Sequence, residues 1–314
     1  MATNNNHQAT ADYKMITDCA LGIPGMKNAT DNLKKLRLEK ADKPGVVIIS
    51  AQKAGSTLLC YICALLNTKN TITKFRNDFD ILPMLSFPTY LIAQNFNARQ
   101  DGVYQMYKIN GTIKQMDPNL GAVKGLNKII WSCREFPGYY RSVYWRIKEF
   151  YPRIGFESFR SVTWDMFQDL TFDLMAEDHV EELWYAYNRI QATDPKEFLP
   201  LVYEHTTKEK VATIHTIAEW LGINISEENI KSIAEKTTKE AMAVGDKFDP
   251  VAYGDGGGLS KVNLKPHTYM ISDNNLMKYQ ARFEERFREV GIYSYSDFST
   301  AIREHHAEQF RRSH

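Results

Sequence analysis

Residues 44–66 read PGVVIISAQKAGSTLLCYICALL, and the fold depends on this stretch. The β-branched run at 46–49 is long enough for a buried strand and too short for a helix. Small and polar residues at 50–57 interrupt the apolar sequence, and 58–66 then reads as an apolar helix. A strand, a tight loop and a helix N-terminus direct unpaired backbone N–H groups at one spot. The stretch therefore predicts a binding site for an oxyanion.

The place of the lysine in this loop separates two classes of oxyanion site. In the nucleoside-triphosphate loop, G-x-x-x-x-G-K-[ST], the lysine follows the second glycine. Here Lys53 precedes Gly55, and Ser50 stands where the first glycine would be. This order disfavours an ordinary ATPase or GTPase loop. A loop with a solvated surface lysine would have the same local sequence, so a second motif has to decide.

That second motif is residues 128–146, KIIWSCREFPGYYRSVYWR, which again reads as a short strand followed by a helix. Arg134 ends the predicted strand, and Pro137 suits the first turn of the helix. Ser142 follows eight residues after the arginine, so a guanidinium and a hydroxyl could hold one phosphate from two sides. Ligands of open parallel sheets bind beyond the carboxyl ends of the strands. Both motifs should therefore face one crevice.

At these motifs the chain resembles the sulfotransferases that use 3′-phosphoadenosine 5′-phosphosulfate (PAPS), a P-loop sulfotransferase superfamily. KAGST at 53–57 is similar to their K-S-G-T-T loop, and Arg134 with Ser142 reproduces their arginine and serine. Residues 201–223 resemble their strand, Tyr-Glu-Asp turn and helix, and the whole resemblance spans residues 44–290. It implies an α/β fold, a single domain with a central parallel β-sheet flanked by helices. It also implies a transferase (EC 2.8.2 type) that moves the sulfuryl group in line, without a metal, and releases 3′-phosphoadenosine 5′-phosphate (PAP).

The resemblance also implies site residues. The PAPS-binding positions are Lys53, Ala54, Gly55, Ser56, Thr57, Leu58, Arg134, Ser142, Tyr203, Thr237, Gly257, Gly258 and Lys261. The catalytic positions are Lys53, Lys108 and Asn110, and the acceptor would be bound by Phe75, Asp78, Phe79 and Tyr107. In this reading Lys53 stabilises the leaving 5′-phosphate oxygen and Tyr203 contacts the adenine.

Two departures from the family pattern bear on the chemistry. Asn110 stands where cytosolic members have a histidine base, and an amide does not accept a proton near neutral pH. Either another group is the base, or the acceptor needs little deprotonation, or the chain is a non-catalytic binder; Asp78, Asp80 and Glu135 are candidate bases. The second departure lies at 256–258, where glycines replace an Arg-Lys-Gly that closes over the 3′-phosphate. Lys261 or Lys265 is a candidate replacement for that contact, and His267 is another candidate base if this loop folds inward.

Composition agrees with a cytoplasmic enzyme. The 314-residue chain has 43% hydrophobic residues and a net charge of +1, which gives no indication of nucleic-acid or anionic-membrane binding. No apolar run approaches the roughly 18 residues of a membrane span, and the N-terminus lacks the apolar core of a secretion signal. We expect a polar, partly disordered lead-in over 1–40, a sulfotransferase domain over 41–314, four reduced cysteines and no metal site. His179, His305 and His306 are expected at the surface.

The expected partner is a small-molecule acceptor with a hydroxyl or an amine, such as a polar natural product or an alkaloid toxin. The alternatives are a non-catalytic relative that binds PAPS or PAP, and a P-loop kinase-like nucleotide enzyme. The oligomeric state, and the choice between O- and N-sulfation, stay open at this stage.

Overall fold

The computed structural model describes residues 13–36, 44–51, 54–71, 102–120, 126–238, 240–242 and 269–312. Within these residues the elements are, in chain order, α2 (Ile23–Leu36), β1 (Gly45–Ser50), α3 (Ser56–Asn67), β2 (Gln105–Asn110), α6 (Ile113–Leu120), β3 (Leu126–Cys133), α7 (Phe136–Trp145), α8 (Trp164–Ala192), β4 (Phe198–Val202), α9 (Tyr203–Lys208), α10 (Lys210–Leu221), α11 (Glu227–Lys236), α14 (Asp273–Phe287) and α15 (Tyr295–Arg312). Short turns of π- or 3-10-helix cover Arg146–Phe150, Tyr151–Ile154, Glu157–Ser161 and Arg288–Val290.

The four strands form one parallel sheet in the order β2-β1-β3-β4. Every residue of β1 is buried, as expected for the central strand of a sheet that is covered on both faces. The strand predicted at 46–49 occurs as β1, and the strand predicted before Arg134 occurs as β3. The α/β fold with a parallel sheet flanked by helices is therefore confirmed.

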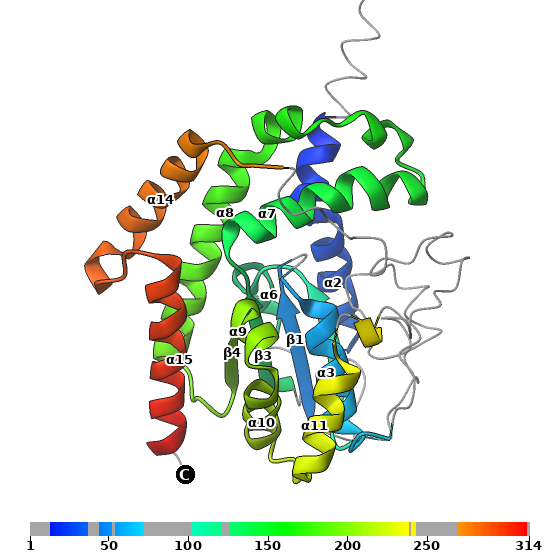
Figure 1. Ribbon diagram of the computed structural model, residues 1–314, viewed down its shortest axis with the longest axis vertical. Coiled ribbons are helices and arrows are strands. Elements are labelled where there is room, and N and C mark those ends of the chain that lie inside the picture. Colours follow the sequence, from blue (N-terminus) through cyan, green and yellow to red (C-terminus); the bar gives the residue numbers. More distant parts are fainter. Residues whose placement is uncertain are drawn as a thin grey trace, which may run out of the picture.

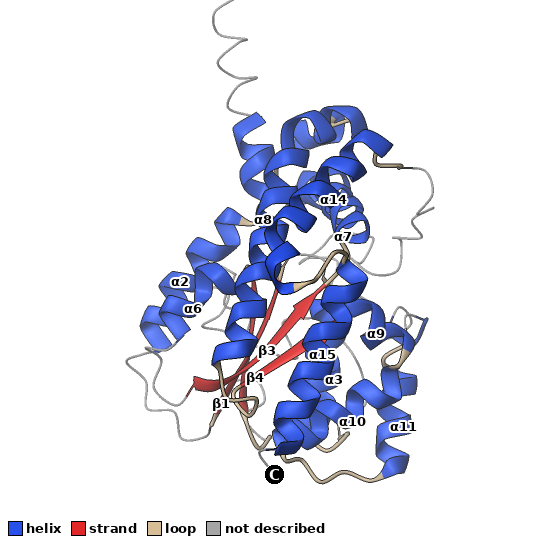
Figure 2. Cartoon of the chain, turned by 90° about the vertical axis from the view of Figure 1, so that its left-hand side faces the viewer, coloured by secondary structure: helices blue, strands red, loops and turns tan. Residues whose placement is uncertain are grey.

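Helices cover the two faces of the sheet in separate layers. Helices α3, α10 and α11 pack on the face that carries Val46 and Ile48. Helices α2, α6, α7 and α8 belong to the larger cluster on the opposite face, which carries Val47 and Ile49. Figures 1 and 2 show the strands between these two groups of helices, and α15 runs beside the edge strand β4. This alternation of core residues along β1 fixes which side chains meet at its carboxyl end.

Local sequence signals explain most of the helix ends. Pro137 lies in the first turn of α7, as predicted. Ser226 caps α11 by accepting the Asn229 N–H at 3.3 Å, and Gly222 ends α10 in the left-handed conformation with φ +66°. The helix predicted to start at Leu58 begins at Ser56, because Gly55 turns the chain directly into it. Helix α11 ends at Lys236, with Thr237 as its C-cap.

The N-terminal segment joins the core where the structure describes it. Residues 13–20 are helical, and Ile16 and Cys19 are buried in the larger cluster. Ala29 and Leu33 of α2 are fully buried in the same cluster. The sequence had suggested a solvated lead-in, because the charged run at 31–43 dominates its composition. The apolar positions of residues 16–33 are nevertheless enough to bury one side of these two helices.

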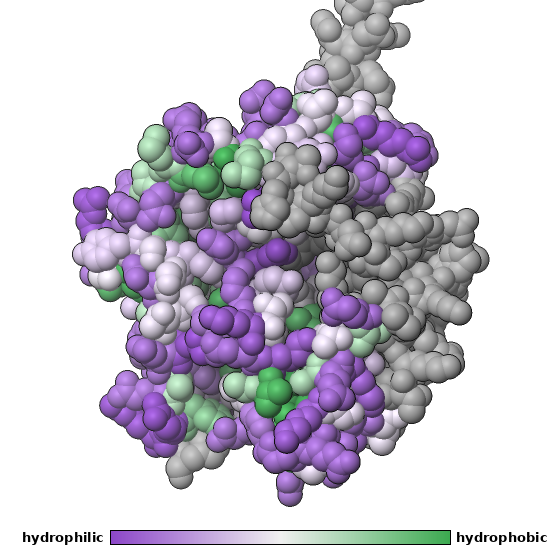
Figure 3. All heavy atoms as spheres, in the orientation of Figure 1, coloured by the Kyte–Doolittle hydropathy of each residue, from purple (hydrophilic) through white to green (hydrophobic). Residues whose placement is uncertain are grey.

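The exposed face shown in Figure 3 is mostly hydrophilic in its described part, with hydrophobic side chains gathered near the upper end of α14. Met270 and Met277, about two thirds exposed at 65% and 66%, are among the large exposed apolar residues. Across the described ranges no helix is both long and apolar enough to cross a membrane. The four cysteines are buried free thiols.

Candidate functional site

Three polar side chains line up at the carboxyl ends of β2, β1 and β3. Ser50 is in register with Asn110 on one side and with Ser132 on the other. Because alternate strand residues face opposite sides, all three lie on the face covered by α3. Asn110 Oδ1 accepts a hydrogen bond from Ser56 Oγ at 3.2 Å, and Ser132 Oγ donates to the Ala54 carbonyl at 3.1 Å. The loop after β1 is thus fastened to both neighbouring strands.

Gly55 is the pivot of this loop. Its φ of +86° lies in the left-handed region, and it forms the N-cap of α3 without a side-chain capping bond. The ring of Tyr203 lies directly against it: a Cβ atom built on Gly55 would stand 2.2 Å from Tyr203 Cδ2. The ring of Tyr203 therefore lies next to the N-terminus of α3, and the lack of a side chain on Gly55 permits this close approach.

Arg134 meets the same ring. Its guanidinium carbon is 4.6 Å from the centre of the Tyr203 ring, a cation–π distance, and its Nη1 donates to Ser142 Oγ at 2.9 Å. Gly138 in the first turn of α7 allows the guanidinium to lie close, since a Cβ atom there would be 3.0 Å from Arg134 Nε. The structure thus brings together Gly55, Arg134 and Ser142, whose motifs were predicted to face one crevice, and Tyr203, which the family resemblance assigned to the same site.

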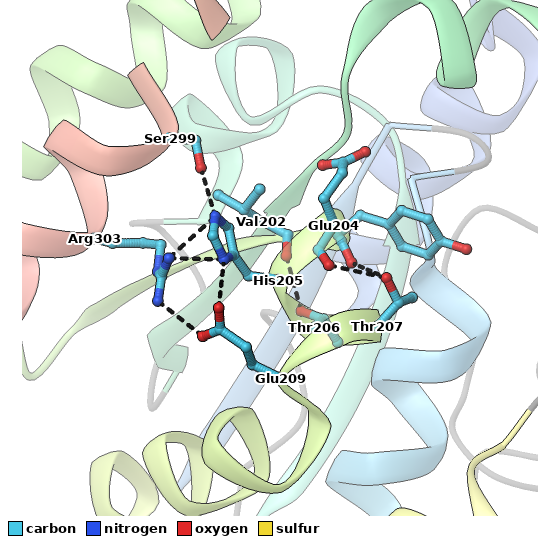
Figure 4. Close-up of polar contacts among 9 residues, drawn as sticks. Val202, Glu204, His205, Thr206, Thr207, Glu209, Ser299 and Arg303 are labelled. Carbon is cyan, nitrogen blue, oxygen red and sulfur yellow. Dashed lines mark hydrogen bonds and ion pairs between the residues drawn. The ribbon is translucent and has the colours of Figure 1, made fainter. Parts of the chain in front are cut away.

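Helix α9, which directly follows β4, is held by Glu209, the residue between α9 and α10, and by residues of α15. His205 follows Glu204 where the family has an aspartate, and Figure 4 shows it between Ser299 and Arg303 of α15 and Glu209. His205 Nε2 lies 3.1 Å from Ser299 Oγ, and Arg303 Nη1 donates to the imidazole at 2.7 Å. Arg303 also pairs with Glu209 at 3.2 Å. These contacts attach the residues after Tyr203 to the C-terminal helix.

Other predicted site residues have varied surroundings. Lys108 and Asn110 share one face of β2, and Lys108 is 1% exposed. Tyr107 points to the opposite face, where it is buried in the larger cluster with its hydroxyl donating to Gln105 at 3.2 Å. Thr237 is also buried, and its hydroxyl donates to the Ile233 carbonyl of its own helix at 2.8 Å. Leu58 is partly buried against the core cluster that contains Val46 and Ile48, and Thr57 precedes it in the first turn of α3.

Several predicted positions lie outside the described residues. These are Lys53, Phe75, Asp78, Phe79, Asp80, Gly257, Gly258, Lys261, Lys265 and His267. The predicted acceptor-binding and glycine-rich segments therefore stay predictions. Within the described ranges, no group of three histidine, cysteine or acidic residues is arranged to hold a metal ion.

Two histidines predicted at the surface are buried, so that prediction was wrong for His179 and His306. Each is 7% exposed, and His306 Nε2 lies 3.1 Å from the Pro195 carbonyl. His179 Nε2 lies 2.9 Å from the carbonyl oxygen of Arg134. Burial lowers the pKa of His179 to about 4, opposed by that hydrogen bond. The charges around His179 in the sequence concealed its inward position on a long helix with polar residues on several sides.

Glu182, one turn after His179 on α8, is a buried carboxylate that sequence reasoning missed. Its oxygens accept the Ile113 N–H at 2.7 Å, the Lys114 N–H at 3.2 Å and the Trp131 Nε1–H at 2.8 Å. It therefore caps α6 directly after the Asn110 end of β2. Burial raises its pKa to about 7, against the lowering effect of these three donors. No sequence signal marked it, because it lies in an acidic run that reads as solvated.

Glu135 is the one candidate base that the structure describes. It begins α7 next to Arg134, with its backbone N–H donating to Glu204 Oε1 at 3.2 Å. Partial desolvation and the nearby Glu204 raise its pKa, while Arg141 and Arg134 lower it. Its position is on the side of Arg134 and Tyr203, across β1 from Asn110.

Comparison with known proteins identifies the family of this arrangement. A family model described as a sulfotransferase domain matches residues 43–249, more than half of the chain. No sequence among the curated proteins matches the chain significantly. The fold is similar to that of retinol dehydratase in complex with androsterone and the inactive cofactor PAP, with 17% identity, 86% of this chain and 88% of that chain covered, and a TM-score of 0.57. It is also similar to mouse sulfotransferase SULT7A1 complexed with PAP, with 15% identity, coverage of 90% and 95%, and a TM-score of 0.56. At such identities the likeness shows a shared fold.

Proposed function

The chain belongs to the sulfotransferase domain family, and we propose that it transfers the sulfuryl group of PAPS to a hydroxyl or amine of a small-molecule acceptor, with PAP as the second product. One observation carries the proposal. The guanidinium of Arg134 is held between Ser142 Oγ and the Tyr203 ring, and that ring lies on Gly55 at the start of α3. A helix N-terminus after β1, an arginine with a serine after β3 and one aromatic ring thus converge, and this arrangement would suit a nucleotide with two separate phosphates.

The described residues suit the parts of PAPS as follows. Arg134 and Ser142 would bind the 3′-phosphate, since a guanidinium and a hydroxyl donate to phosphate oxygens from two directions. The N–H groups after Gly55, with Ser56 and Thr57, would bind the 5′-phosphate at the N-terminus of α3. Tyr203 would lie against the adenine. PAPS itself supplies the activated sulfuryl group.

Catalysis in such a site rests on fixed donors where negative charge develops. Lys53, in the loop after β1, would stabilise the leaving phosphate oxygen, and Lys108 would contact the transferred sulfuryl group. The low exposure of Lys108 supports this role, because an ammonium group acts more strongly where water is excluded. Asn110 accepts a hydrogen bond from the Ser56 hydroxyl. This role needs only an acceptor oxygen, so the side chain does not have to take up a proton.

A small-molecule alcohol is the first acceptor class to test. Retinol dehydratase, whose fold is similar, was solved in complex with androsterone and PAP and in complex with retinol and PAP. A polar natural product or alkaloid toxin is the second class, because Asp78 and Asp80 flank Phe79 in the predicted acceptor segment. These aspartates are also the preferred candidates for the base, since Glu135 lies on the nucleotide side of Asn110.

The direct test is calorimetric titration with PAP of the wild type, of Arg134→Ala and of Arg282→Ala. Arg282 is a matched control, because its guanidinium pairs with Asp173 at 2.8 Å on the surface between α14 and α8. Loss of the charge-assisted contact of Arg134 should cost about 1.5–3 kcal/mol, which weakens binding roughly ten- to a hundredfold. The control should bind as the wild type does. Absence of binding by folded wild type would contradict the proposal.

A transfer assay separates the enzyme from a non-catalytic relative. The wild type and Lys108→Ala would be incubated with PAPS and a panel of phenols, steroids, aliphatic alcohols and amines, and PAP release would be measured. We expect release with at least one acceptor and a large loss in the variant. PAP binding without release on any acceptor would favour the non-catalytic alternative, which Asn110 at the base position suggests.

A further inference from the structure

Three consecutive residues at the end of β3 are contacted, directly or through one other side chain, by two tyrosines of the C-terminal helices. The residues are Cys133, Arg134 and Glu135, and the tyrosines are Tyr279 of α14 and Tyr295 of α15. Both tyrosines lie beyond residue 249, where the match to the family ends. The turn that carries the proposed 3′-phosphate arginine is thus supported from outside the family match.

Tyr279 acts on the backbone of Arg134 through His179. The Arg134 carbonyl can only accept, so His179 Nε2, 2.9 Å away, carries the proton and donates it. In a neutral imidazole Nδ1 is then an acceptor, and the Tyr279 hydroxyl, 3.0 Å away, donates to it. Burial keeps both groups neutral, because it lowers the pKa of His179 and raises that of Tyr279. The ring of Tyr279 also stacks on Phe136 with a centroid distance of 4.4 Å, which fixes the direction of its hydroxyl.

Tyr295 acts on the next residue through Glu204. Its hydroxyl donates to Glu204 Oε2 at 3.2 Å, and Glu204 Oε1 accepts the backbone N–H of Glu135 at 3.2 Å. The same hydroxyl lies 3.5 Å from Cys133 Sγ. Glu204 directly follows Tyr203, so this bridge joins the turn of Arg134 to the turn of the aromatic ring that Arg134 faces.

We propose that Tyr279 and Tyr295 are positioning residues of the nucleotide site. Through His179 and Glu204 their hydroxyl groups set the backbone on both sides of Arg134, and so the direction in which its guanidinium reaches Ser142 and Tyr203. The inference rests on the proposed function, because it concerns the binding of the 3′-phosphate by Arg134.

The test removes single hydroxyl groups. Tyr279→Phe and Tyr295→Phe are compared with Tyr144→Phe, whose hydroxyl donates to the Val162 carbonyl at 3.2 Å and whose side chain is 1% exposed. Thermal midpoint and the dissociation constant for PAP are measured for each. We expect similar losses of stability in all three, PAP binding about three- to tenfold weaker for the first two, and a change below about twofold for Tyr144→Phe.

Nitrogen NMR of His179 tests the relay, the hydrogen-bond chain from Tyr279 through His179 to the Arg134 carbonyl, without PAP. In ¹⁵N-labelled protein, the ring nitrogens of His179 should show the Nε2–H tautomer, with Nδ1 unprotonated at pH 7 and its shift changed in Tyr279→Phe. In binding, His179→Gln keeps an amide donor near the Nε2 position but has no Nδ1 acceptor for Tyr279, so it should weaken the affinity for PAP about three- to tenfold, as Tyr279→Phe does, whereas His179→Leu should weaken it more than tenfold.

The outcomes separate the two ideas. Folded wild type that does not bind PAP overturns the proposed function and the positioning role with it. Wild type that binds PAP, with equal affinity in all three phenylalanine variants, overturns the positioning role alone. An Nδ1–H tautomer of His179 in the wild type overturns the Tyr279 relay whatever the binding result.

Discussion

Replacing Gly55 by alanine should damage the stability and the nucleotide site together. Alanine in the left-handed region costs about 1–2 kcal/mol, and Gly55 has φ +86°. The added Cβ would also lie 2.2 Å from Tyr203 Cδ2 and 2.7 Å from Cε2, where ordinary contact begins at 3.4 Å. The ring therefore has to retreat by more than an ångström, an overpacking cost of about 1–3 kcal/mol. Together we expect a loss of about 2–5 kcal/mol of unfolding free energy.

Gly222→Ala is the control that separates strain from collision. Gly222 has φ +66°, but a Cβ atom there meets nothing within 4 Å, so only the backbone strain of about 1–2 kcal/mol remains. Both variants would be unfolded in urea and titrated with PAP. Gly55→Ala should be the less stable by about 1–3 kcal/mol and should bind PAP at least tenfold more weakly, while Gly222→Ala keeps wild-type affinity. Equal stability and equal affinity of the two variants would refute the contact between Gly55 and Tyr203.

The next prediction concerns two buried titratable groups, His179 and Glu182. The pKa of His179 is lowered to about 4, so its contribution to stability is lost as the pH falls from 6.5 towards 4, when the unfolded chain takes up a proton that the folded protein does not. The pKa of Glu182 is raised to about 7, so the folded protein keeps a proton that the unfolded chain loses, and stability falls as the pH rises from 4.5 towards 7. The free energy of unfolding in urea would be measured at pH 6.5 and at pH 5. Relative to the wild type, His179→Gln should gain about 2 kcal/mol between these two pH values, and Glu182→Gln should lose about 2 kcal/mol. If the stabilities of both variants change with pH as that of the wild type does, neither group titrates as described. Asn110→Ala removes the acceptor of the Ser56 hydroxyl and should weaken PAP binding by about three- to tenfold. An unchanged affinity in calorimetry would show that Asn110 does not position Ser56 for binding.

Much of the fold followed from short apolar runs. The strand at 46–49 is β-branched throughout and the one at 129–133 begins with β-branched and aromatic residues, so length and composition were enough to predict both. The meeting of Gly55 with Arg134 and Ser142 was predictable because parallel strands present their carboxyl ends at one edge of the sheet. The place of Tyr203 in the same site came from the family resemblance.

Contacts between distant helices were beyond sequence reasoning. Helix α8 carries His179 and Glu182 among several charged residues, and its 29 residues pack against α6, α7, α14 and α15 in turn. A helix that changes its packing partner along its length shows no single apolar stripe, so its inward residues do not stand out. The contacts of Tyr279 and Tyr295 depend in the same way on where α14 and α15 dock. A pattern of local residues holds no information on that docking.

The central claim is that Arg134 recognises a 3′-phosphate, and a cycle of two proteins and two ligands tests it most directly. The wild type and Arg134→Ala would each be titrated with PAP and with adenosine 5′-phosphate, which lacks the 3′-phosphate. The account predicts that the wild type prefers PAP by about ten- to a hundredfold, and that the variant binds both ligands about equally. A preference for PAP that is unchanged in Arg134→Ala would contradict it.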